Sequence, residues 1–113
     1  ILILNGMKLT FKTKDKLHVV SADEILICEV VGNYSRLVLN DKKIIIHIPL
    51  KRLMLLLPND TFFRCHSSFI INLNKVSEFN LSTNKVLINN KIIVPVSLRC
   101  RQNLFKTLIN ILH

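Results

Sequence analysis

The chain has 113 residues, which allows one domain with one modest hydrophobic core. Half of the residues are apolar, and only two are glycine and three proline, so the composition excludes a disordered or collagen-like protein. The formal net charge is +9, from 16 basic and seven acidic residues, and residues 61–113 hold seven of the basic residues but one acidic residue. This excess favours a polyanionic partner such as nucleic acid, although a solvated basic surface gives the same count.

Short strand-like segments fill the first part of the chain. Residues 8–13 alternate in polarity and place Leu9 and Phe11 on one face. Similar runs follow at 17–20, 26–30, 35–39 and 43–48, with turn-forming residues at 13–16, 32–34 and 40–43. His18 and His47 occupy alternating positions in these runs, and we expect them at the surface or its rim. The frequent turns predict packed antiparallel β-sheets and not alternating strand–helix units.

Residues 49–57 have helical periodicity. Their apolar positions repeat on one face between Pro49 and Pro58, at Leu50, Leu53, Met54 and Leu57. The pattern predicts a short helix that lies on the sheets, with Met54 in the core.

Strand-like runs then return at 62–65, 68–72, 76–79, 85–88 and 91–94. Asn89 and Asn90 predict a two-residue hairpin, because asparagine tolerates a positive φ. Ser97 is placed to cap a final helix, with Arg99 just inside its start. The apolar positions of this helix are expected to face the sheet: Leu104, Phe105, Leu108, Ile109 and Leu112. The predicted fold class is therefore mainly β, with one short helix mid-chain and one C-terminal helix.

Compartment and membrane association also follow from the sequence. The longest apolar run, Leu53–Leu57, has five residues, far below the roughly 20 that span a bilayer, so we expect no membrane partner. The odd number of cysteines, without CxxC spacing, indicates a reducing cytoplasm and neither a disulfide framework nor a zinc site; they are Cys28, Cys65 and Cys100. The chain begins with isoleucine and its first methionine is Met7, so we expect a fragment of a longer protein.

The sequence gives little support to catalysis. Cys65 and His66 are adjacent, so in an extended strand their side chains point to opposite faces and form a poor thiolate–imidazole pair. Asp23 and Glu24 follow Ser21, where carboxylates stabilise the start of a helix or turn. The sequence has no glycine-rich phosphate loop and no cluster of metal ligands. We therefore expect no enzyme, no cofactor and no metal.

Two segments place polar side chains beside apolar anchors. Residues 62–72 (FFRCHSSFIIN) and 95–101 (PVSLRCR) offer side chains that bond to base edges: His66, Ser67, Ser68, Arg99 and Arg101. Taken alone, the first segment also resembles any loop that enters a buried strand. Duplex DNA is favoured over single-stranded RNA, because the chain has no tryptophan and one tyrosine on which bases would stack.

The order of four segments resembles the LytTR family, the DNA-binding output domain of many bacterial response regulators. The resemblance runs from about Met7 to Leu112 through DEILICEVVGNYSRLVL (23–39), IPLKRLMLLLP (48–58), FFRCHSSFIIN (62–72) and IIVPVSLRCRQNL (92–104). Its most specific part is the phenylalanine–arginine–X–histidine segment with the downstream asparagine.

This resemblance implies that loops, and not a recognition helix, enter successive major grooves. It places DNA contacts at Asn33, Tyr34, Ser35 and Arg36, at His66, Ser67 and Ser68, and between Ser97 and Arg101. Ser35, Ser67 and Arg99 align with the base-facing positions. Many relatives have a longer polar or basic residue at Ser67 and some have histidine near Ser35, so we expect an unusual base preference or affinity.

We therefore expect residues 1–113 to form a single LytTR-like domain, with its core at about 7–112. It would bind duplex DNA sequence-specifically in a bacterial transcription regulator of the two-component type, as pairs of protomers on promoter repeats. A linked receiver domain outside this chain is compatible with that expectation. The alternative is a basic protein-interaction module whose apolar edge strands recruit an acidic partner.

Overall fold

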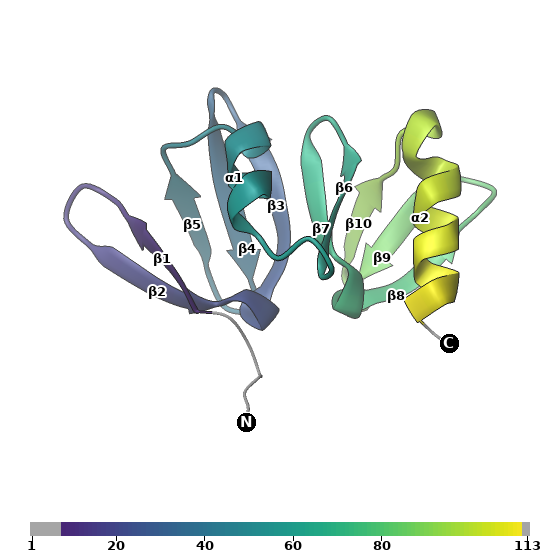
Figure 1. Cartoon of the computed structure of the whole chain (residues 1–113), viewed down its shortest axis with the longest axis horizontal. Coiled ribbons are helices and arrows are strands. Elements are labelled where there is room, and N and C mark those ends of the chain that lie inside the picture. Colours follow the sequence, from purple (N-terminus) through teal and green to yellow (C-terminus); the bar gives the residue numbers. More distant parts are fainter. Residues whose placement is uncertain (1–7, 112–113) are drawn as a thin grey trace.

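The computed structural model describes residues 8–111, and within them the chain forms three antiparallel sheets and two α-helices (Figure 1). The strands are β1 (Lys8–Lys12), β2 (Leu17–Ser21), β3 (Ile25–Val31), β4 (Tyr34–Leu39), β5 (Lys43–Ile46), β6 (Phe62–His66), β7 (Phe69–Asn72), β8 (Val76–Asn80), β9 (Lys85–Ile88) and β10 (Ile92–Pro95). The helices are α1 (Leu50–Leu56) and α2 (Leu98–Ile111), with two short 3-10 turns, η1 (Ala22–Glu24) and η2 (Leu73–Lys75). The predicted fold class is confirmed. Met7 and Leu112, the expected limits of the core, lie outside the described residues.

The central sheet has five strands in the order β5-β4-β3-β7-β6 and is buried on both faces. Its strands carry consecutive buried residues, such as Ile27 and Cys28 in β3 and Ile70 and Ile71 in β7. Successive side chains of a strand point to opposite faces, so these runs supply two separate cores. Cys28 and Ile70 pack with α1 and the β1–β2 hairpin, whereas Ile27 and Ile71 pack with α2 and the sheet β10-β9-β8.

Helix α1 covers the first of these faces. Leu50, Leu53 and Leu57 are buried and Met54 packs against them, as the periodicity predicts. The helix begins at Leu50, one residue later than predicted, because Pro49 has the extended ψ of 156° of an N-cap residue. The Pro49 carbonyl accepts the first helical hydrogen bond from the backbone N–H of Leu53 at 3.0 Å.

Two tight turns depend on residues that tolerate a positive φ. Asn89 and Asn90 have φ angles of 54° and 58°, and the N–H of Lys91 donates to the carbonyl of Ile88 at 3.0 Å, so the predicted hairpin is confirmed. Gly32, between β3 and β4, has a φ of 59°, and a Cβ atom there would meet nothing within 4 Å. The backbone conformation, and not a lack of space, therefore requires glycine.

Helix α2 is rotated relative to the prediction. Leu104 is fully buried and Leu108 packs beside it, but Phe105 and Ile109 are each 42% exposed, so the prediction that they face the sheet is wrong. The buried stripe instead continues from Cys100 at intervals of four residues. The fifth predicted position is Leu112, outside the described range.

Several of the connections lie at two opposite edges of the molecule. The β3–β4 turn and the β6–β7 turn share one edge with the starts of α1 and α2, at the top of Figure 1. The β4–β5 and β9–β10 turns lie together at the other edge, where Asn89 Nδ2 donates to Asn40 Oδ1 at 2.9 Å. Within residues 8–111, no helix has the length and apolar character needed to cross a membrane.

Leu53→Ala should lower the free energy of unfolding by about 2–5 kcal/mol, because Leu53 is fully buried in the α1 core. Leu55→Ala is the matched control: Leu55 is on the same helix but 82% exposed, so the change should stay within about 0.5 kcal/mol. Urea denaturation of both variants measures the difference. Equal effects of the two variants would contradict the assigned orientation of α1.

Candidate nucleic-acid interface

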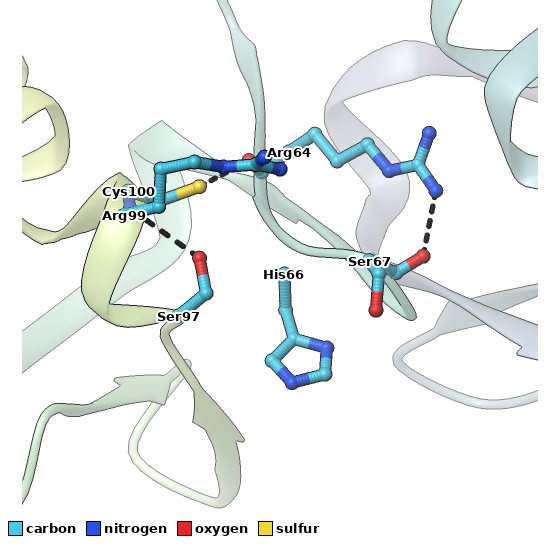
Figure 2. Close-up of a pocket in the computed structure, with 6 residues that line it drawn as sticks. All are labelled: Arg64, His66, Ser67, Ser97, Arg99 and Cys100. Carbon is cyan, nitrogen blue, oxygen red and sulfur yellow. Dashed lines mark hydrogen bonds between the residues drawn. The ribbon is translucent and has the colours of Figure 1, made fainter.

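A groove of about 590 Å³ lies where β6 meets the start of α2 (Figure 2). We call it the central groove, and it is lined by Arg64, His66, Ser67, Ser97, Arg99 and Cys100. The N–H of Ser97 donates to the carbonyl of Cys65 at 2.9 Å, and Cys100 Sγ donates to the carbonyl of Arg64 at 3.6 Å. These bonds hold together two segments that are about 30 residues apart in the sequence.

His66 is held in one orientation by the turn that follows it. The backbone N–H of Ser68 donates to His66 Nδ1 at 3.1 Å, and the ring meets the edge of Phe69 at a centroid distance of 5.7 Å. Because Nδ1 accepts this bond, the neutral ring carries its proton on Nε2. In Figure 2 the ring lies between Ser97 and Ser67, and among residues 8–111 no hydrogen bond engages Nε2, so its N–H remains available as a donor.

Arg64 lines the central groove and also a second groove. Its Nη2 donates to the carbonyl of Ser67 at 2.6 Å, and in Figure 2 its side chain extends toward Ser67, away from Arg99. The second groove, of about 460 Å³, is formed by the β3–β4 turn and the start of α1 and includes Asn33, Tyr34 and Lys51. The predicted residues Asn33 and Tyr34 are therefore next to the predicted His66 segment, with Arg64 between them.

Arg99 is the exposed cation of the central groove. Ser97 caps α2 as predicted, since its Oγ accepts from the N–H of Cys100 at 3.3 Å, which puts Arg99 at the second helical position. Among residues 8–111 the Arg99 guanidinium has neither an ion pair nor a hydrogen bond, and α2 carries no acidic side chain. The Arg99 side chain extends from α2 toward Arg64 (Figure 2), and an exposed guanidinium without a partner is well suited to an anionic ligand.

Arg101, also a predicted contact, has a different position. Its Nη1 donates to the carbonyl of Leu81 at 2.7 Å and to Asn84 Oδ1 at 3.3 Å. Both acceptors belong to the β8–β9 turn, and Arg101 does not line the central groove. Its guanidinium therefore joins α2 to that turn.

Two predicted contact residues of β4 have partners within the protein. Ser35, expected to face a base, is fully buried, and its Oγ donates to the carbonyl of Ile48 at 2.8 Å. Arg36 is paired with Glu29 at 2.9 Å across β3 and β4, which neutralises its charge. Alternation along β4 explains the first result, because Ser35 shares a face with the core residue Leu37.

Two residues that line these grooves were not among the predicted contacts, Arg64 and Lys51. Arg64 stands two residues before His66 in strand β6, with buried Cys65 between them, so alternation alone indicates an outward basic side chain beside the histidine. For Lys51 no sequence signal is evident, because its place in the second groove depends on how α1 packs against the β3–β4 turn.

The cysteine beside His66 is unsuited to catalysis. Burial raises the pKa of the Cys65 thiol to about 12, and its Sγ donates to the carbonyl of Pro95 at 3.6 Å. Within the described range there is no group of three or more cysteine, histidine or acidic residues placed to hold a metal ion.

Comparison with known proteins identifies the architecture. The family model for the LytTr DNA-binding domain matches residues 15–109. The chain belongs to the LytTR family. LytTR domains are DNA-binding and non-enzymatic, which confirms that the chain is not an enzyme.

One similar solved structure is the LytTr DNA-binding domain of a putative methyl-accepting/DNA response regulator from Bacillus cereus. It aligns with a TM-score of 0.72 and 28% sequence identity, over 90% of this chain and 95% of that one. Among curated proteins, no sequence matches.

Ser35→Ala should lower the free energy of unfolding by about 1–2 kcal/mol, because it leaves the Ile48 carbonyl without its hydrogen bond. The affinity of the folded domain for DNA should not change. Ser67→Ala is the matched control, since Ser67 is exposed in the central groove: its stability should stay near wild type while DNA affinity falls. Urea denaturation and fluorescence anisotropy measure the two quantities. A Ser35→Ala protein with normal stability and weakened DNA binding would contradict the burial of this side chain.

Proposed function

We propose that this domain binds duplex DNA sequence-specifically by inserting its turns into successive major grooves, as the output domain of a response regulator. The observation that carries the proposal is the convergence of Arg64, His66, Ser67 and Arg99 in one groove, where the Arg99 guanidinium has no ion pair with any of residues 8–111. The role as an output domain of a response regulator is supported by the LytTR family match and by the similar domain of the response regulator from Bacillus cereus.

Each side chain has a role that suits its geometry. Arg99 is exposed and able to bond to both O6 and N7 of guanine. His66 Nε2–H and the Ser67 hydroxyl donate to base acceptors on the same side. Lys51 and Arg64, which line the second groove, contact phosphates, and Asn33 of the β3–β4 turn reaches a base edge. Ser35 and Arg36 are not retained among these contacts.

Protomers act in pairs on repeated half-sites in this proposal. A single groove of this size contacts few base pairs, and two copies on neighbouring repeats multiply the discrimination against unrelated DNA. The proposed pairing follows from the family resemblance and from the small size of the domain.

A competition experiment distinguishes this function from a basic module that binds an acidic protein. Duplexes selected by the protein from a random pool are compared with unselected duplex at several salt concentrations. Specific DNA binding predicts a preference for the selected duplex that persists as salt rises, and a log–log slope of several units. Equal affinity for both duplexes, or binding that is independent of salt, would favour the protein-interaction module.

Arg99→Ala should weaken binding to the selected duplex by about 1–3 kcal/mol and relax the preference at one base pair. Random duplex should be affected much less. If Arg99 instead contacts a phosphate, both duplexes should weaken alike and the salt slope should fall by about one unit. Arg101→Ala, measured in parallel, should act mainly on thermal stability, because its bonds to Leu81 and Asn84 are lost. Unchanged binding of Arg99→Ala to every duplex would remove Arg99 from the interface.

Two replacements of His66 separate its two ring nitrogens. In His66→Asn the amide oxygen is placed near Nδ1 and still accepts from the N–H of Ser68, but the outward donor is lost. In His66→Gln a donor remains near Nε2, but the bond to the turn is lost. We expect His66→Asn to keep the melting temperature of the wild type and to lose specific binding. We expect His66→Gln to have a lower melting temperature and to keep specific binding. The opposite pattern would mean that the histidine stabilises the turn and does not contact DNA.

A further inference from the structure

The two grooves continue into a third one through an aromatic stack. Tyr34, in the second groove, stacks on His47 with ring centroids 4.4 Å apart and an interplanar angle of 19°. His47 in turn lines a groove of about 360 Å³ between the β1–β2 turn and β5. This third groove also contains Thr13, Lys14, Asp15, Lys16, His18, Lys43, Ile44 and Ile45.

The third groove has a defined shape. The N–H of Thr13 donates to the carbonyl of Lys16 at 2.9 Å and closes the turn that carries Lys14. Thr13 Oγ1 lies 3.3 Å from His18 Nε2, which attaches the turn to β2. On the other side, Lys43 and His47 are exposed at alternate positions of β5 and just beyond it, at the edge of the central sheet.

The charged side chains along these grooves are almost all positive. We call the basic residues that line them the basic band: Lys14, Lys16, Lys43, Lys51, Arg64 and Arg99. Among the described residues that line the three grooves, Asp15 is the sole acidic one. In Figure 1 the β1–β2 turn lies at the left end of the molecule and the start of α2 toward the right, so the elements that carry the band are arranged along the longest axis.

The cations of the third groove are suited to phosphates more than to base edges. They are lysines, which act as flexible point charges, whereas the cations of the central groove are arginines. The molecule is 44 Å long, which corresponds to about 13 base pairs of straight duplex and exceeds one helical turn. A duplex seated on the central groove and running along the band therefore passes the third groove.

We propose that Lys14, Lys16 and Lys43 bind the phosphate backbone of DNA that flanks the sequence-specific site on one side. The inference rests on the proposed function and adds to it a contact that carries no base preference. Full affinity then requires a longer duplex than the base contacts alone would need. The extra base pairs are needed only on the side of the site that faces the third groove.

A triple variant, Lys14→Ala/Lys16→Ala/Lys43→Ala, tests the contact. Its matched control is Lys42→Ala/Lys75→Ala/Lys91→Ala, which removes the same charge from three lysines that line none of the three grooves. On a selected duplex with long flanks, the first variant should lose about tenfold or more in affinity at low salt. The slope of log affinity against log salt concentration should be smaller by about two to three units. The control should stay close to wild type. Melting temperatures verify that both variants fold.

Trimming the duplex gives a second measurement that uses wild-type protein. As base pairs are removed from each end in turn, wild-type affinity should fall early at one end, and the first variant should be insensitive to trimming at that end. Hydroxyl-radical footprints of the wild type should extend further on that side. Equal sensitivity at both ends, or equal affinity of the two triple variants, would overturn the flanking contact and leave specific binding intact. Failure of wild-type protein to prefer the selected duplex over random duplex would overturn the proposed function together with the contact that rests on it.

Discussion

Burial of the central sheet on both faces is the constraint on which the rest of the structure depends. Strands with consecutive apolar residues leave neither face compatible with water, so each face requires its own cover. The N-terminal hairpin and α1 cover one face, and the C-terminal sheet and α2 cover the other. The turns between the central strands then emerge at the edges. This arrangement brings the β3–β4 turn, the β6–β7 turn and the start of α2 to the same edge, although they are far apart in the sequence (Figure 1).

Local sequence patterns were sufficient for most of the fold. The apolar stripe of α1, the asparagine hairpin and the capping role of Ser97 each depend on residues within one turn or two of the chain, so periodicity and turn chemistry predict them. The rotation of α2 was not predictable in this way. Phe105 and Leu104 are equally apolar, and which of them is buried depends on how the helix meets the sheet β10-β9-β8.

The candidate site was predictable in outline but not in its individual contacts. His66, Ser67 and Arg99 converge in one groove, as their residue types and the family resemblance led us to expect. Ser35 and Arg101 do not lie in that groove. Their partners, the Ile48 carbonyl and the β8–β9 turn, are 13 and about 20 residues away in the sequence, so local patterns do not reveal them. Net charge was also a poor guide to position: Arg36 is neutralised by Glu29, whereas Arg64 inside an apolar strand joins two grooves.

The bond between Arg64 and the Ser67 carbonyl has a consequence for the thermodynamics of association. A guanidinium has five N–H donors, so this bond holds the side chain and the β6–β7 turn in place while other donors remain free. Immobilising a long side chain at an interface otherwise costs about 0.5–1.5 kcal/mol of rotamer entropy. With Arg64 and His66 ordered in the free protein, that loss has already occurred during folding. In the proposed complex this turn therefore needs no conformational search, and diffusion and electrostatic attraction limit the rate of association.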